Sequence, residues 1–231
     1  MDREEFLKLA ANPNSNLKNL RFIQEEIGQR VILKDDFITP IEYIGGVDSA
    51  YIDDTAITAC VILKWPDLKL IEHKNVVLKT KFPYISTFFA FREGPSILEV
   101  LSHMETMPNI LMINSQGILH PTFAGCASHI GVITNQPTIG IAQDALCGEW
   151  ESEPTSVGDW VPIKFQDRVV GAYFLSQRES KPIIISPGNK ITLETTVKII
   201  EQCIKGHKLP EPIRLAHKFA NEEKRKLQQN L

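Results

Sequence analysis

Residues 109–148 read NILMINSQGILHPTFAGCASHIGVITNQPTIGIAQDALCG, and this stretch decides the fold. It opens with an apolar run at 110–113, short enough for a buried strand, which ends in a cluster of turn formers at 114–117. Small residues after Pro121 suit a helix packed closely on a sheet, and a second apolar run follows at 138–142. The pattern predicts two neighbouring parallel strands joined by a helix. Polar groups just beyond the carboxyl ends of such strands are the expected place for chemistry.

The rest of the chain extends this unit into a larger α/β sheet. Apolar positions among charges on both sides of 12–14 predict two amino-terminal helices, and β-rich runs between 41 and 79 predict an antiparallel three-stranded meander. We expect a helix to begin near Gly94 and Pro95, and a second hairpin at 160–175. A short strand at 183–185 should end in a turn at 186–190, before a helix at 193–204. These elements predict a central mixed sheet, a meander followed by α-β-α-β, with helices on both faces.

Composition limits the classes of function. The chain has 231 residues, 43% of them hydrophobic, which suits a single domain over residues 1–231 with one sizeable core. The net charge is −3, so a nucleic-acid ligand would need a local basic surface. The four cysteines show no CxxC pair, which argues against a zinc site or a disulfide framework. The first residues lack the apolar core of a secretory signal, so we expect a cytoplasmic protein.

Three segments of the central stretch follow one motif order: NSQGILHP at 114–121, AGCASHIG at 124–131 and PTIGIAQDALCG at 137–148. The stretch resembles the central part of endonuclease V, a nuclease that nicks nucleic acid near deaminated adenine. The family pattern is similar to DGxGxxHP, AGxASHxG and PTIGVAKxxLCG, and it implies an RNase H-like fold. Asn114 stands where the pattern has Asp, and Gln143 stands where it has Lys. Both departures fall on positions that the family uses for catalysis. Ser115, Gln116 and Asn189 also depart from the usual residues, so we interpret the chain as a naturally divergent member.

The resemblance implies a metal site made by Asp48, Glu93, Asn114 and His217. Asp48 lies in GVDSAY at 46–51, Glu93 ends an F-R-E run, and His217 ends LPEPIRLAH at 209–217, all of which are similar to family motifs. Taken alone, these side chains are more often a strand-end carboxylate, a helix-start carboxylate and a surface histidine. Hydrolysis of a phosphodiester benefits from hard Mg²⁺ or Mn²⁺ ions held by carboxylates. An amide oxygen at Asn114 binds such an ion without adding negative charge.

The same resemblance implies a nucleic-acid surface. Pro83 and Tyr84 match a P-Y-x loop that acts as a wedge and separates a base from its stack, although a Pro-Tyr pair alone is more often a loop anchor. Backbone N–H groups of the turns that contain Gly117, Ser186 and Gly188 are candidates to line a base pocket. The remaining predicted contacts to the base or to nucleic acid are Arg92, His120, His129 and Gln143.

Two functions of different classes follow. The first is a metal-dependent endonuclease of the endonuclease V type, retuned or weakened, that hydrolyses a phosphodiester near a deaminated base such as inosine. The second is a nucleic-acid-binding or protein-binding chain that kept the fold and the wedge and lost turnover. The sequence leaves DNA and RNA both open as partners, because the contact to the 2′-hydroxyl that separates them has no readable signature.

Overall fold

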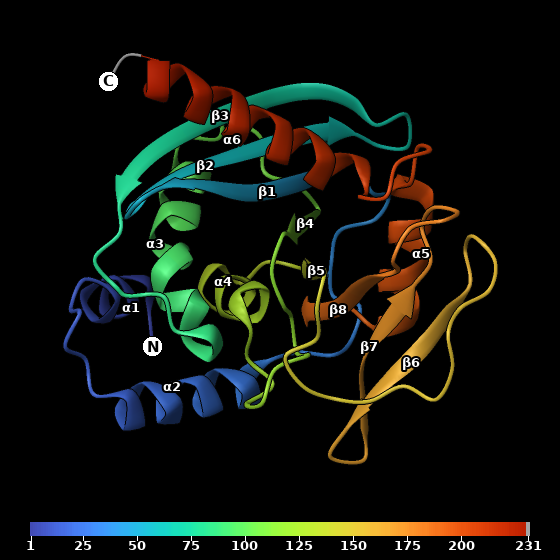
Figure 1. Cartoon of the computed structure of the whole chain (residues 1–231), viewed down its shortest axis with the longest axis horizontal. Coiled ribbons are helices and arrows are strands. Elements are labelled where there is room, and N and C mark those ends of the chain that lie inside the picture. Colours follow the sequence, from blue (N-terminus) through green and yellow to red (C-terminus); the bar gives the residue numbers. More distant parts are fainter. Residues whose placement is uncertain (230–231) are drawn as a thin grey trace.

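A computed structural model gives the structure of residues 1–229, whose strands form one sheet (Figure 1). The strands are β1 (Tyr43–Ile52), β2 (Thr55–Lys64), β3 (Lys69–Lys79), β4 (Ile110–Ile113), β5 (Thr138–Ala142), β6 (Trp160–Phe165), β7 (Arg168–Phe174) and β8 (Ile183–Asn189). Their order in the sheet is β3-β2-β1-β4-β5-β8-β7-β6. Within residues 1–229 the strands therefore join edge to edge into one continuous sheet.

The pairing confirms the predicted mixed sheet. β1, β2 and β3 form an antiparallel meander, and β4 and β5 run parallel to each other and to β1. In register, Val47 pairs with Ile113, and Ile113 pairs with Gly140. The carboxyl ends of β4 and β5 consequently lie together beside the middle of β1, which continues to Ile52. The chain places Asp48, Asn114 and the residues after Ala142 there.

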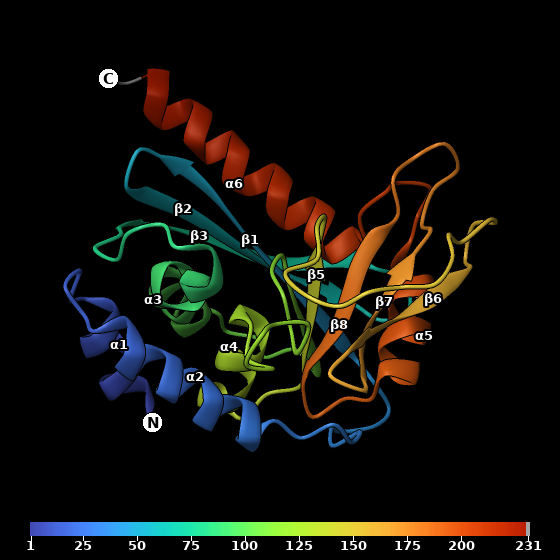
Figure 2. The same ribbon diagram turned by 60° about the horizontal axis from the view of Figure 1, so that its bottom comes forward.

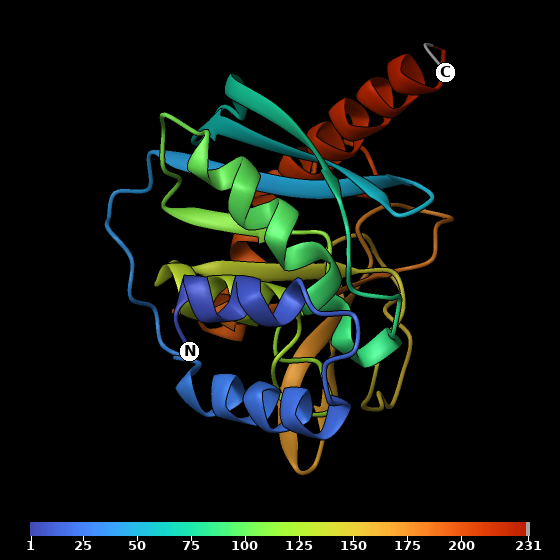
Figure 3. The same cartoon turned by 90° about the vertical axis from the view of Figure 1, so that its left-hand side faces the viewer.

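Helices cover both faces of the sheet, as predicted (Figure 2). They are α1 (Arg3–Ala10), α2 (Leu17–Arg30), α3 (Phe89–Ser102), α4 (Cys126–Thr134), α5 (Leu193–Cys203) and α6 (Glu211–Gln229), with a 3-10 turn η1 (Ser86–Phe88) before α3. The first four helices pack on one face, and α5 and α6 pack on the other. α6 crosses the meander, and its carboxyl-terminal end extends past the strands (Figure 3).

Alternation along the central strands explains why the molecule has a core on each face. On β4, Leu111 and Ile113 join the core under α1 to α4, whereas Ile110 and Met112 join the core under α5 and α6. A strand that is apolar at every position is typical of a parallel strand covered on both sides. The short run at 110–113 thus occupies the centre of the fold.

Two predicted boundaries were wrong. α3 begins at Phe89, five residues before Gly94, because Phe91 packs against Phe6 and Phe82 and this burial favours helix ahead of the proline. β8 continues through Asn189, so the expected turn at 186–190 is largely strand. Its pairing with β5 explains this, since Ser186 lies opposite Gly140 and Pro187 lies opposite Ile139. Within residues 1–229, no helix is both long and apolar enough to cross a membrane.

Candidate active site

Asp48 is the centre of a hydrogen-bonded cluster at the carboxyl edge of the sheet. Its side chain is 5% exposed, and both carboxylate oxygens accept hydrogen bonds. The Asn114 amide nitrogen lies 2.6 Å from Asp48 Oδ1, and His217 Nδ1 lies 2.7 Å from Oδ2. The parallel pairing of β1 and β4 produces the first contact, and the Asn114 backbone N–H donates to Val47 O at 3.0 Å. Three of the four predicted metal-site residues are therefore in direct contact.

Helix α6 brings His217 to this edge. A Cβ on Gly46 would lie 2.3 Å from the carbonyl of Pro212, so the absence of a side chain there allows the start of α6 to pack directly on β1. The hydrogen bond from His217 to Asp48 raises the pKa of the imidazole. Its side chain is 58% exposed, in contrast to the buried carboxylate it contacts. His217 is thus the solvent-facing member of the cluster.

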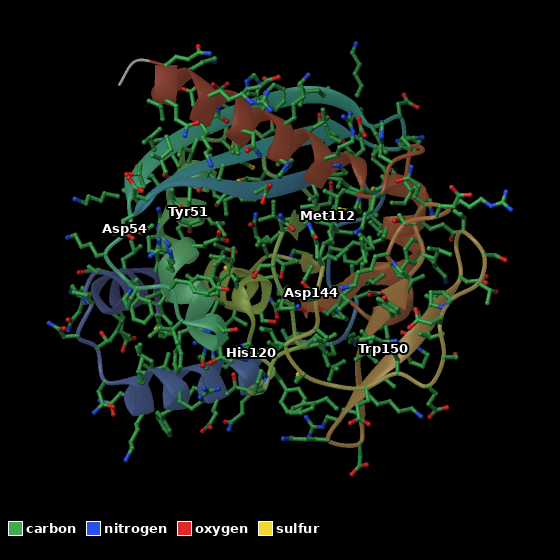
Figure 4. All side chains as sticks on the ribbon, in the orientation of Figure 1. Tyr51, Asp54, Met112, His120, Asp144 and Trp150 are labelled. Carbon is green, nitrogen blue, oxygen red and sulfur yellow. The ribbon has the colours of Figure 1, made fainter. Side chains whose placement is uncertain are left out.

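Glu93 lies behind the cluster, on the buried face of α3. Burial raises the pKa of its carboxyl well above the ordinary value, and the charge of Asp48 raises it further. Tyr51, labelled in Figure 4, lies close enough to this carboxyl for its buried hydroxyl to act on the pKa of Glu93. Burial and the Glu93 charge raise the pKa of that hydroxyl as well. We did not single out Tyr51 in the sequence, although it is the last residue of the GVDSAY motif.

The donor set fits a hard cation by its charge and chemistry. Among residues 1–229, no three His, Cys, Asp or Glu side chains gather closely enough to form a metal cluster. The fourth corner is held instead by Asn114, whose amide group offers oxygen as well as the nitrogen that now contacts Asp48. Asp48 and Glu93 are both buried, and the pKa of Glu93 is raised first by burial and then by the charge of Asp48. A cation held by these residues would offset the repulsion between the two carboxylates.

The predicted wedge loop is exposed, and the buried side chain of Arg92 anchors it to the protein. Tyr84 is 69% exposed and meets Phe89 edge to face at 5.9 Å, and Pro83 beside it is exposed too. Arg92 is buried under the loop, donates to Phe82 O at 2.8 Å and pairs with Asp54 at 3.1 Å. Its guanidinium is thus engaged within the protein, which argues against a direct contact with nucleic acid and indicates that Arg92 fixes the base of the loop.

The two turns expected to offer backbone donors to a base instead bind each other. The Gly117 N–H donates to the Ser186 hydroxyl at 2.8 Å, and the Ile118 N–H donates to Pro187 O at 2.8 Å. A Cβ on Gly117 would lie 2.1 Å from Pro187 O, and one on Gly188 would lie 2.3 Å from the Thr138 hydroxyl. Ser186 and Gly188 are buried in β8, so the prediction that they line a base pocket is not what their positions indicate.

The two histidines predicted to contact nucleic acid, His120 and His129, are buried. His120 lies 2.9 Å from Thr87 O through Nε2 and 2.9 Å from the Thr122 hydroxyl through Nδ1, and burial lowers its pKa to about 4. His129 is packed beside Phe6 and Phe91 with neither ring nitrogen hydrogen-bonded, and burial lowers its pKa to about 3. Both positions favour support of the fold over direct contact with nucleic acid.

Gln143 is exposed one residue beyond the end of β5, on the same sheet edge as Asp48 and Asn114. A lysine there would place a positive charge near the cluster, whereas the amide is neutral. The carboxylate of the next residue, Asp144, forms an ion pair with Lys181 at 2.6 Å.

Comparison with known proteins identifies the family. The endonuclease V family model matches residues 25–218. An endonuclease V from Nostoc sp. is 39% identical over 201 residues, which are 86% of this chain and 91% of the relative. The crystal structure of endonuclease V from Bacillus subtilis has a TM-score of 0.88 at 28% identity, covering 94% of this chain and 95% of that one.

A second solved structure carries nucleic acid. Endonuclease V from Ciona intestinalis, in complex with a 24mer DNA containing an inosine followed by a ribo-adenosine, has a TM-score of 0.81 at 26% identity, covering 91% of this chain and 98% of that one. These structural neighbours have an RNase H-like fold, which confirms the predicted fold class. By the match of its sequence over most of its length, the chain belongs to the endonuclease V family.

Proposed function

We propose that this chain is a divalent-metal-dependent endonuclease that hydrolyses a phosphodiester near a deaminated base, inosine being the first candidate, in DNA or RNA. The observation that carries the proposal is the cluster of Asp48, Asn114 and His217 beside the buried Glu93. Membership of the endonuclease V family supports it, as does the Ciona intestinalis relative, which holds an inosine-containing DNA.

Mg²⁺ or Mn²⁺, when bound, supplies positive charge that activates water and stabilises the leaving oxygen. The chain's part in the reaction follows from its contacts. Asp48 and Glu93 provide negative charge, and Asn114 provides an amide oxygen in place of a third carboxylate. His217 holds its Nδ1 proton against Asp48 Oδ2, which orients that carboxylate.

In this proposal, the exposed wedge loop at Pro83 and Tyr84 accounts for selectivity toward a deaminated base. Inserting a rigid side chain between base steps unstacks them at a cost of about a few kcal/mol per step. That cost is lowest where pairing is already weak, as at a mismatch or a damaged base. Pro83 and Tyr84 are exposed at the tip of a loop that Arg92 anchors, so the loop presents a stiff apolar edge.

A nicking assay tests the proposal. We expect an inosine-containing strand to be cut with Mn²⁺ or Mg²⁺, and Asp48→Ala to abolish cutting. Asp67→Ala is the matched control, since Asp67 is an exposed carboxylate in the turn between β2 and β3 and should leave cutting unchanged. Cutting that survives Asp48→Ala would refute the assignment of the site.

One observation favours a second function, a binding protein without turnover. The Asn114 amide nitrogen occupies Asp48 Oδ1, an oxygen that a cation would need, and Gln143 brings no positive charge. In that case the purified chain would bind an inosine-containing strand more tightly than an unmodified one and cut neither. Measured affinity and cutting on the same substrates separate the two functions.

A further inference from the structure

Helix α2 turns one face outward beside the segment that follows the wedge loop. Its inner face is buried and packs on α4, and Figure 1 shows α2 as the outer helix on that side of the molecule. The outer face of α2 and the 3-10 turn η1 line a shallow, open groove of about 400 Å³, formed by Leu17, Lys18, Arg21, Phe22, Glu25 and Phe88. Residues 18, 21, 22 and 25 share one side of the helix because they are three, four and seven positions apart.

Two apolar side chains in this groove are exposed, although the helix has a buried face of its own. Phe22 is 60% exposed and Leu17 is 43% exposed. The next residue, Ile23, packs against the core, so burial of α2 does not depend on Phe22. A single exposed apolar residue is ordinary, but an exposed aromatic ring inside a groove is a surface on which another planar group can stack.

Two cations lie in the same groove. The Arg21 guanidinium lies 4.9 Å from the centre of the Phe88 ring and donates to the Thr87 hydroxyl at 3.1 Å. These contacts hold the guanidinium in place and use only part of its five N–H donors, so others remain for a phosphate. Lys18 is exposed one turn earlier in the helix. Against these two cations the groove has one carboxylate, Glu25, so its lining carries a net positive charge.

The groove continues from the proposed wedge. η1 begins two residues after Tyr84, and its last residue, Phe88, is part of the groove. Tyr84 in turn meets the ring of Phe89, the residue after Phe88, at 5.9 Å. A wedge that enters a stack separates a base from its neighbours and from its partner. The strand beside Tyr84 therefore becomes unpaired where the groove begins.

We propose that this face of α2 binds the single-stranded flank of the substrate, which is the unpaired stretch of strand beside the base that the wedge displaces. Phe22 provides a ring on which one base of the flank stacks, and Lys18 and Arg21 contact its phosphates. A positively charged groove with aromatic side chains is typical of surfaces that bind unpaired strands without reading their sequence. The inference rests on the proposed function and adds to it a second binding site for the same strand.

The test is a cycle of two proteins and two kinds of ligand, with binding in EDTA as the readout so that no strand is cut. The ligands are inosine-containing single strands whose two nucleotides on one side of the inosine either carry bases or are abasic, and both sides are tested in turn. We expect Phe22→Ala to weaken binding of the intact strand roughly tenfold, the scale of one stacked base. On the strand that is abasic at the stacked position, the same substitution should change nothing, because the ring has lost its partner.

The contact of Lys18 with phosphate is tested by the dependence of affinity on salt. For a single strand, the slope of log affinity against log salt concentration changes by about 0.7 for each phosphate contact. We expect Lys18→Gln to reduce that slope by about this amount on intact and abasic strands alike, since both keep the phosphates.

Ile38→Ala and Lys198→Gln are the matched controls. Ile38 is 80% exposed in the segment before β1, and Lys198 is exposed on α5, which covers the other face of the sheet, so affinity and slope should stay as in wild type. If Phe22→Ala binds the intact strand as wild type does, or loses as much on every abasic strand, the inference is overturned, and inosine-dependent nicking shows that the proposed function still stands. If wild type neither prefers nor cuts inosine-containing strands, the proposed function fails and takes this inference with it.

Discussion

Asn114→Asp is the change that tests most directly how the site holds a cation. In the structure the Asn114 amide donates to Asp48 Oδ1 at 2.6 Å. Replacing that amide by a carboxylate removes the donor and sets a second negative group against the buried Asp48, with Glu93 close behind. The substitution should therefore destabilise the folded protein without metal and stabilise the metal-bound form.

The magnitude follows from Coulomb's law. Two unit charges about 4 Å apart interact by roughly 4 kcal/mol at an effective dielectric constant near 20, and part of this is avoided when one carboxyl takes up a proton. We expect the variant without metal to unfold more easily than wild type, by about 1–3 kcal/mol, and added Mg²⁺ to reverse the loss. Changes around metal ligands alter affinity by about 10–100-fold, so a change of a ligand itself should raise Mg²⁺ affinity by at least that range.

Thermal unfolding with and without Mg²⁺, titration calorimetry with Mg²⁺ and Mn²⁺, and nicking of an inosine strand read out the three consequences. Adding Gln143→Lys should increase nicking further, because a lysine at the end of β5 supplies positive charge near the phosphate. Asn12→Asp is a suitable control, since Asn12 is exposed in the loop between α1 and α2. If Asn114→Asp shows no larger stabilisation by Mg²⁺ than wild type, the inferred repulsion is wrong. If wild type already cuts well and the variant cuts less, the site has adapted to the amide.

Three further predictions rest on separate contacts. Tyr84→Ala should weaken binding to a strand with a deaminated or mismatched base more than binding to plain duplex, because its ring is 69% exposed at the wedge. Equal losses of affinity for both ligands at one salt concentration would exclude the wedge role. Ile71→Ala, at an exposed position on β3, is the control. His129 has a pKa of about 3 in the folded protein against an ordinary 6.5, so as the pH falls the unfolded state takes up this proton first and the folded state loses stability below about pH 6.5. His129→Leu should reduce the slope of the unfolding free energy against pH, between pH 6 and 4, by up to about 1.4 kcal/mol per pH unit. An unchanged slope would contradict the burial argument. Ser186→Ala should cost about 1–3 kcal/mol in denaturant unfolding because it leaves the buried Gly117 N–H without an acceptor, whereas Ser180→Ala, at an exposed contact, should cost little.

The sheet was readable from the sequence because its elements are set by local patterns. The apolar run at 110–113 and the hairpin at 66–68 needed no knowledge of distant residues. The boundary errors at α3 and β8 have the opposite origin. Packing of Phe91 on Phe6, from a distant helix, extends α3 across Arg92 and Glu93, and pairing with β5 turns the Ser-Pro-Gly segment into strand. Proline and glycine are local signals, and tertiary contacts overrode them at both places.

Among the predicted site residues, those on or directly after the central strands were easier to place than those in the surrounding loops. Asn114 follows the end of β4 and meets Asp48 because β4 pairs in parallel with β1, with Val47 opposite Ile113. Arg92, His120 and Ser186 were predicted to face a ligand, and the structure turns each inward to a backbone carbonyl or N–H. A polar residue in a motif shows that a contact is needed, but it does not show whether the contact is with the ligand or with the protein.

Gln24 and Gln116 show what only the structure supplies. The position of Gln116 in its motif says nothing about which group its amide nitrogen contacts, and Gln24 stands in a helix with an ordinary amphipathic pattern. The direction is decided by Thr87 O and Asp144 O, which claim the two amide nitrogens from elements far away in the chain. Because an amide is a donor at one end and an acceptor at the other, these two contacts leave the amide oxygens of Gln24 and Gln116 as the free acceptors. A sequence motif identifies the residue, and contacts with distant elements decide which of its atoms stays without a partner.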